Sequence, residues 1–298
     1  GDAIVAWRGT RELCVLSPVE AGGQAGFGIF VAGLEDDELR LVTEGLEADP
    51  IALAPGAVVA VARGLDTDLA RLGADGVLVP LSRHTGTLSE LGASRDGGIV
   101  ACVLHDRVPD VWAGPPDGEL VRVSNLAPEL AGVEWAPRER LAWRAPDGLE
   151  LDGLLLLPPG RIRADGPFPL VVMLHGGPYW RFGDDVQLWW AAPGEWLAAA
   201  GYAVFCPNPR GGLGHGAGFA RAVRAAVGVA DAQHDLLAGP EPAPSRRVLD
   251  LDRRRAPAER TALLERPWEL ALRGAAELAG QDARERLALA VAAALVDV

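Results

Sequence analysis

The stretch Leu170-Val171-Val172-Met173-Leu174-His175-Gly176-Gly177-Pro178 decides how this sequence is interpreted. Its apolar first half has the pattern of a strand that is buried on both faces inside a parallel sheet. His-Gly-Gly follows directly, and a backbone N–H just past a central strand can point at an oxyanion that develops on a substrate. Glycine there lets a substrate approach the main chain. Taken alone, the stretch suits a simple glycine turn equally well.

The residues around this stretch predict an α/β sheet. Residues 141–157 read as a hairpin that turns at Asp147-Gly148. Residues 189–200 have helical spacing that stops at Gly201, residues 202–206 suit a second buried strand, and residues 218–237 suit a second helix. Strand and helix therefore alternate, which predicts right-handed crossovers between parallel strands.

Residues 1–140 have the sequence pattern of an all-β region. Short apolar runs are separated by Gly, Pro, Asp and Ser, and Asp-Gly pairs stand at 75–76, 96–97 and 117–118, each 21 residues from the next. Asp-Gly between apolar runs indicates a tight hairpin, because both residues tolerate positive φ. Two such hairpins make one propeller blade of about 40 to 45 residues. An irregular sandwich with coincidental spacing is the alternative.

Composition narrows the class of protein. The 298 residues carry a net charge of -13, which repels phosphate backbones and argues against nucleic acid as a partner. The longest apolar stretch, residues 287–296, is too short to span a membrane. The three cysteines, Cys14, Cys102 and Cys206, are too few and too widely spaced for a disulfide framework. We therefore expect a cytoplasmic protein that contacts no membrane.

Several motifs, in order, carry a family resemblance. They include residues 143–148 (Trp-Arg-Ala-Pro-Asp-Gly), 175–178 (His-Gly-Gly-Pro), 207–211 (Pro-Asn-Pro-Arg-Gly) and 214–219 (Gly-His-Gly-Ala-Gly-Phe). Together they resemble the prolyl oligopeptidase family of serine peptidases, and its acylaminoacyl peptidase branch most of all. The resemblance covers roughly residues 94–239, about half of the chain.

The resemblance implies a β-propeller leading into an α/β-hydrolase domain, with peptide or acyl-peptide substrates cleaved by a Ser-Asp-His triad. Residues 1–140 would be the last propeller blades, 141–239 the N-terminal part of the hydrolase domain with half of its sheet, and 240–298 a helical or disordered tail unlike the family. No cofactor and no metal are implied, and the oligomeric state stays open.

The resemblance also assigns roles to site residues. In the loop His175-Gly176-Gly177-Pro178, Gly177 with Gly176 beside it would supply an oxyanion amide. His175, Asn208 and Arg210 would shape the surrounding loops and take no part in proton transfer.

The sequence departs from the family at the nucleophile. The G-x-S-x-G turn that lifts the serine clear of the sheet does not occur in these 298 residues. Of the six serines only Ser245 follows the oxyanion loop, and no histidine follows His234. We therefore predict that this chain is inactive, and whether it is an enzyme stays open.

We interpret the chain as an incomplete copy. We expect it to be cut at its start and, near Gly239, either truncated and fused or shifted out of frame, because glycine and aromatic residues become scarce beyond that point. In the case of a shift, the coding DNA read in another frame after residue 239 should encode G-x-S-x-G.

Other interpretations stay in view. A non-catalytic propeller or hydrolase-like scaffold protein is the main alternative. Residues 212–217 fit G-x-G-x-x-A, with Asp231 downstream, and weakly suggest a dinucleotide site. Asp231, His234 and Asp235 could be imagined as metal ligands, although a solvated helix face explains them better. The aromatic residues near the loop are expected mainly in the core, with a cleft lining as the second option; they are Tyr179, Trp180, Trp189, Trp190 and Trp196.

Overall fold

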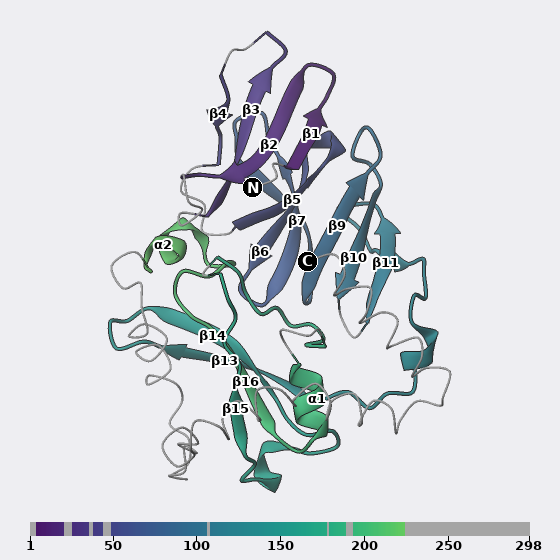
Figure 1. The fold of residues 1–298 in the computed structure, drawn as a ribbon. Coiled ribbons are helices and arrows are strands. Elements are labelled where there is room, and N and C mark those ends of the chain that lie inside the picture. The colour runs from purple at the N-terminus through teal and green to yellow at the C-terminus, as the bar shows by residue number, and fades with distance from the viewer. Residues whose placement is uncertain are drawn as a thin grey trace, which may run out of the picture. The chain divides into compact units, whose positions relative to one another are not determined.

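Three four-stranded antiparallel sheets form the N-terminal part of the chain (Figure 1). The computed structural model describes residues 4–20, 26–35, 38–43, 49–105, 108–177, 179–188 and 193–223. The first sheet contains β1 (Ile4–Arg8), β2 (Glu12–Pro18), β3 (Phe27–Gly33) and β4 (Arg40–Leu41). The second contains β5 (Asp49–Ala54), β6 (Val58–Arg63), β7 (Asp66–Leu72) and β8 (Leu78–His84). The third contains β9 (Thr87–Ala93), β10 (Val100–His105), β11 (Pro109–Gly114) and β12 (Val121–Arg122).

The Asp-Gly pairs lie at the predicted hairpin turns. Asp75-Gly76 connects β7 to β8, Asp96-Gly97 connects β9 to β10, and Asp117-Gly118 connects β11 to β12. Gly76 and Gly97 have φ of 83° and 67°, the left-handed region that glycine enters without steric cost. The turns at 75–76 and 117–118 occupy the same place in two successive sheets. The repeat predicted from this spacing is confirmed: two successive spacings of 21 residues separate equivalent turns of neighbouring four-stranded sheets.

Side chains that alternate along β6 join the three sheets into one packed region. Val59 and Val61 belong to a core cluster shared with the first sheet, whereas Val58 and Ala60 belong to a cluster shared with the third. All four are nearly inaccessible to solvent. Both faces of the second sheet are therefore covered, which explains the unbroken apolar run from 58 to 62. Burying each valine contributes about 1.5 to 3 kcal/mol.

A fourth sheet follows, with both parallel and antiparallel pairs. Its order is β13-β14-β16-β15, in which β13 pairs with β14 and β14 with β16 antiparallel, and β15 runs parallel to β16. The helix α1 lies between β15 and β16 in the chain, and α2 follows β16. Its elements are β13 (Arg138–Arg144), β14 (Glu150–Leu156), β15 (Leu170–Val172), α1 (Gly194–Ala199), β16 (Ala203–Asn208) and α2 (Gly216–Arg221).

The strand before the His-Gly-Gly loop is not buried on both faces, so that prediction was wrong. Within the described residues β15 pairs only with β16 and stands at the edge of the sheet. Leu170 and Val172 are 56% and 42% exposed, while Met173 packs in the core below. Apolar residues on both faces do not by themselves place a strand in the middle of a sheet, because position depends on which neighbours pair with it.

The predicted helices are shorter in the described residues. The first begins at Gly194 and ends before Gly201, whose φ is 94°, as the glycine stop predicted. The second begins at Gly216, two residues earlier than predicted, and ends at Arg221. Residues 189–192 and everything from 224 onward lie outside the described residues. No helix among the residues described is long and apolar enough to cross a membrane.

Candidate functional site

The His175 ring lies behind the His-Gly-Gly loop and packs on two aromatic rings. Its centroid is 5.4 Å from that of Trp180 and 5.2 Å from that of Phe182, both edge-on. Nδ1 lies 2.9 Å from the Gly176 carbonyl oxygen, which can only accept, so Nδ1 carries the proton. Burial lowers the pKa of His175 and keeps the ring neutral near pH 7. This placement suits the predicted loop-shaping role.

The two glycines of the loop are exposed and differ in conformation. Gly177 has φ of 136°, and a Cβ built there would lie 2.6 Å from the Tyr179 backbone nitrogen. A Cβ on Gly176 would meet nothing within 4 Å. Only the second glycine is therefore required by the local geometry. Pro178, the last residue of the predicted loop, lies outside the described residues.

Asn208 ties the segment after the loop to the end of β16. It is fully buried; its Oδ1 accepts from the Phe182 N–H at 2.7 Å, and its Nδ2 donates to the Phe182 carbonyl at 3.0 Å. Nδ2 also donates to Asp152 Oδ1 on β14 at 2.8 Å. One amide side chain thus satisfies both backbone groups of Phe182 and orients the chain that leaves the His-Gly-Gly loop.

Two further ion pairs fix the segment that follows β16. Arg210 pairs with Asp147, in the turn between β13 and β14, at 2.6 Å. His215 Nε2 lies 3.1 Å from Asp152 Oδ2, and its ring stacks on Phe219. Burial lowers the pKa of His215, but the hydrogen bond and charge of Asp152 outweigh it and raise the pKa above its ordinary value.

Asp49, at the start of β5, holds this same segment from the side of the second sheet. Its Oδ2 accepts the backbone N–H groups of Gly214 at 2.6 Å and Gly216 at 3.1 Å. Its Oδ1 accepts the Tyr179 hydroxyl at 2.8 Å, and the Tyr179 oxygen in turn accepts the Phe27 N–H. The glycine-rich run at 212–217 therefore directs two amides at a carboxylate of its own chain, which is not the geometry of a free dinucleotide site.

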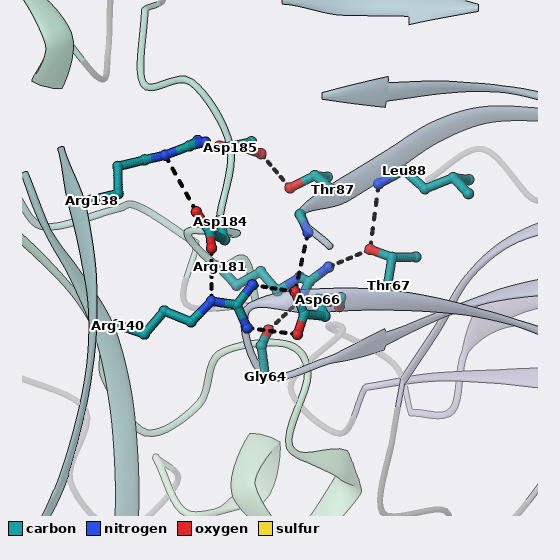
Figure 2. A network of polar contacts seen from close by, with 11 residues as sticks. Gly64, Asp66, Thr67, Thr87, Leu88, Arg138, Arg140, Arg181, Asp184 and Asp185 are labelled. Atoms are coloured by element: carbon teal, nitrogen blue, oxygen red, sulfur yellow. Dashed lines mark hydrogen bonds and ion pairs between the residues drawn. The ribbon is translucent and has the colours of Figure 1, made fainter. Parts of the chain in front are cut away.

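Arg181 anchors the segment after the loop to the turn between β6 and β7 (Figure 2). Its guanidinium donates to the carbonyl oxygens of Gly64 and Asp66 and, at 2.8 Å, to the Thr67 hydroxyl. Arg181 is only 5% exposed. Every nitrogen at the tip of this side chain is thus engaged with the second sheet.

A second arginine, on β13, extends the same network in Figure 2. Arg140 makes a bidentate pair with the Asp66 carboxylate at 2.6 and 2.7 Å, and its Nε donates to Asp184 at 2.7 Å. Arg138 Nε lies 3.4 Å from the other Asp184 oxygen. Charge-assisted bidentate pairs are stronger and more directional than single contacts. The fourth sheet and the segment after the loop are thereby connected to the second sheet.

A cavity of about 660 Å³ lies beside this network. Its walls come from the second and third sheets, the residues before β13 and the segment that follows the His-Gly-Gly loop. They are mainly apolar and include Trp135 and Trp180. Such a concave, largely apolar space with a few polar groups is typical of a site that binds a small molecule or a peptide side chain.

The polar part of the cavity wall lies on β9 and β10 and on the segment after the loop. Ser89 Oγ is 2.9 Å from His105 Nε2, and burial lowers the pKa of His105. Thr87 donates its hydroxyl to Asp185, whose other oxygen accepts from the Gln187 amide. Burial raises the pKa of Asp185 to about 6, against the lowering effects of Thr87, Arg181 and Arg138. The sequence contains no motif that predicts these residues, because the contact between β9 and the segment after the loop joins residues far apart in the chain.

The other candidates from the sequence have mixed outcomes. Trp180 both packs on the core and lines the cavity, whereas Trp196 is 41% exposed. Trp189, Trp190 and the imagined ligands Asp231, His234 and Asp235 lie outside the described residues. Among the residues described, no group of three or more His, Cys, Asp or Glu side chains is placed to hold a metal.

Comparisons with known proteins identify peptidases. No protein-family model matches the chain. An uncharacterized peptidase, YuxL, of Bacillus subtilis (strain 168) is 34% identical over 93 residues, which are 31% of this chain and 13% of that protein. Dipeptidyl aminopeptidase BIII of Pseudoxanthomonas mexicana is 34% identical over 110 residues, 35% of this chain and 15% of that protein. The chain thus matches only a small part of each relative.

The fold corresponds to that of a solved peptidase. The structure of Pyrococcus horikoshii acylaminoacyl peptidase superposes with a TM-score of 0.60 at 19% identity, over 79% of this chain and 37% of that one. The mostly β architecture with few helices matches the β-propeller domain of proteins of this kind. The predicted resemblance to prolyl oligopeptidase-type peptidases is confirmed at the level of relatives and fold.

Proposed function

Because the chain is related to peptidases of the prolyl oligopeptidase family, we propose that it carries the oxyanion loop and one side of the peptide-binding cavity of such an enzyme. In this proposal residues 141–239 are the N-terminal part of an α/β-hydrolase domain. The parallel pair β15 and β16 with α1 between them supports that assignment, since it is the strand-helix-strand unit from which such sheets are built. Residues 1–140 are the last propeller blades, and residues 240–298 a tail unlike the family.

One observation carries the proposal: the cavity and the oxyanion loop are joined by the same short segment. Trp180 lines the cavity, and its ring packs on His175 of the loop. A peptide held in the cavity would therefore lie near the exposed residues Gly176 and Gly177. An amide fixed at such a place stabilises a developing oxyanion by about 2.7 to 4 kcal/mol, because it needs no reorganisation during the reaction.

The 298-residue chain by itself is proposed to bind peptides without cleaving them, since it contains no G-x-S-x-G serine. The assay is hydrolysis of peptide nitroanilides and of nitrophenyl esters by the purified chain, with and without a serine-directed inhibitor. We expect no inhibitor-sensitive turnover. Hydrolysis that the inhibitor abolishes would show that a nucleophile has been overlooked.

Peptide binding is tested separately by calorimetry with short apolar peptides. Leu130 lines the cavity, so Leu130→Trp should fill it and abolish binding. Leu126→Trp is the matched control, because Leu126 is 60% exposed and its replacement leaves the cavity unchanged. Equal binding by both variants would place the peptide elsewhere.

The second candidate function is a non-catalytic binding or scaffold protein. The exposed Leu170 and Val172 at the edge of the fourth sheet favour it, because an apolar sheet edge is a surface for pairing with another chain. Both proposals predict no turnover. Cooperative unfolding of a monodisperse chain would favour the scaffold, and aggregation would favour the incomplete peptidase. A cytoplasmic location belongs to both proposals.

A further inference from the structure

A serine–histidine pair in the second sheet has no proton available for chemistry. Ser82 Oγ lies 2.8 Å from His84 Nε2 and 2.7 Å from the Pro116 carbonyl oxygen. A carbonyl oxygen can only accept, so the Ser82 hydroxyl donates its single proton there. The contact with His84 is then made with the oxygen as acceptor, and the histidine cannot draw a proton from this serine.

A second serine–histidine pair, in the third sheet, has the opposite arrangement. Ser89 Oγ lies 2.9 Å from His105 Nε2, which is its one hydrogen-bond partner among the described residues. The two side chains are diagonal neighbours on one face of the antiparallel pair β9–β10, because Thr87 is opposite His105. Burial lowers the pKa of His105 and keeps the ring neutral near pH 7. With its own proton on Nδ1, the ring accepts the Ser89 proton at Nε2.

The backbone of β9 is irregular directly after this serine. The register between β9 and β10 shifts between Ala101 and Val103, so two residues of β9 oppose one residue of β10. Glu90, which follows Ser89, has φ of 50°, an uncommon value for a residue with a side chain. Bulges of this kind are over-represented beside active sites, where they redirect a side chain. The strain at Glu90 is therefore a second observation that points to Ser89.

The reactive pair lies in the wall of the cavity. Ser89 and His105 both line the space of about 660 Å³, whereas the Ser82 pair does not. The other charged side chains of the described wall are Arg181 and Asp185, and each is engaged with protein groups. The two charges also act on one another. Because the rest of the wall is mainly apolar, the space beside Ser89 suits an uncharged acyl group.

We propose that Ser89 is a nucleophile with His105 as its general base, and that an activated ester with an apolar acyl group acylates it in this cavity. Ser89 Oγ attacks the ester carbonyl carbon while His105 Nε2 takes the hydroxyl proton. The Oγ–C bond forms, and the bond to the leaving group breaks with its electron pair going to that group. His105 then passes the proton to water. This site is separate from the His-Gly-Gly loop, so the inference goes beyond the proposed function.

The reaction is expected to stop at the acylated serine. A nitrophenolate is a good leaving group, but hydrolysis of the product would have to expel the far poorer serine alkoxide. That second step needs a donor for the oxyanion, and Arg181 and Gln187 in the wall already donate to other groups. Among the described residues no carboxylate orients His105 either. The acyl group should therefore remain on Ser89.

The test is a burst assay with para-nitrophenyl butyrate on the 298-residue chain at pH 7, followed by peptide mapping in a mass spectrometer. We expect release of about one equivalent of nitrophenolate, little release afterwards, and a butyryl group on Ser89. The chain contains no lysine, so no lysine amine competes for the ester.

Three variants assign the chemistry. Ser89→Ala should abolish the burst. His105→Gln can keep a hydrogen bond to Ser89 but cannot take its proton, so it should slow the burst at least about tenfold. Ser82→Ala is the matched control, because it removes a serine of the same kind outside the cavity wall and should leave the burst unchanged.

Mapping of the unaltered chain decides the matter even if a variant does not fold. An adduct on another residue, or no burst at all, would overturn the role of Ser89 and leave peptide binding, which calorimetry measures separately, untouched. An equal burst in His105→Gln would overturn the role of the base. Steady turnover that is lost in Ser89→Ala would support the nucleophile and contradict instead the proposal that the chain does not cleave its ligands.

Discussion

Replacing Asn208 should detach the segment that follows the His-Gly-Gly loop. Asn208→Leu preserves the approximate volume but leaves the Phe182 N–H and carbonyl without the side chain that satisfies both. Each buried polar group left unpaired costs about 1 to 3 kcal/mol, so the two together should lower the free energy of unfolding by about 2 to 6 kcal/mol. The measurement is urea unfolding of the variant and the unaltered chain at pH 7.

A control and a local readout separate this effect from general damage. Asn125 is exposed, so Asn125→Leu should change stability by less than about 0.5 kcal/mol. Because the Arg181-Phe182 peptide bond lies at the detached segment, trypsin should cut after Arg181 faster in Asn208→Leu under native conditions. If the two asparagine variants unfold at the same urea concentration, the hydrogen bonds of Asn208 do not hold the segment.

Four further variants test the network and the loop. Gly177→Ala should destabilise the chain by about 1 to 3 kcal/mol, because φ is 136° there, whereas Gly176→Ala should be nearly neutral; equal melting temperatures would show that the loop tolerates a side chain at both positions. Arg140→Met should lose about 1 kcal/mol in chemical unfolding, less at high salt, because the side chain is 42% exposed and its pairs with Asp66 and Asp184 are partly screened; a salt-independent loss would contradict an ionic origin. The raised pKa of His215 gives stability that is fully present below the unfolded pKa of about 6.5 and is lost as pH rises through the folded pKa. His215→Gln should therefore cost more at pH 5.5 than at pH 8.5 in urea unfolding, and a cost that does not vary with pH would contradict the pairing with Asp152.

Local sequence was sufficient for the hairpins and their repeat. The turns at Asp75-Gly76 and Asp96-Gly97 could be predicted without a structure. A turn with positive φ favours glycine at the turn itself, so the signal is local to the sequence. The stop of α1 at Gly201 was predictable for the same reason.

The candidate site could be predicted only in part. The family resemblance predicts an oxyanion loop at residues 175–178 and a loop-shaping role for Asn208, and the structure adds the hydrogen bonds of Asn208 to Phe182 and Asp152. Asp185 and His105, by contrast, have no motif around them. They become candidate site residues only because the segment after the loop and the strands β9 and β10 line the same cavity.

What the sequence by itself determined is the repeat of the hairpins, the His-Gly-Gly loop after an apolar strand and the lack of a G-x-S-x-G serine in these 298 residues. What only the tertiary structure decided is the edge position of β15 among the strands of the described residues, and the attachment of the loop segments to the second sheet. Arg181 reaches Asp66 across 115 residues of chain, and Gly214 reaches Asp49 across 165. The conformation of a turn or a helix end depends on a few neighbouring residues. Contacts across such long separations depend on how every intervening element packs.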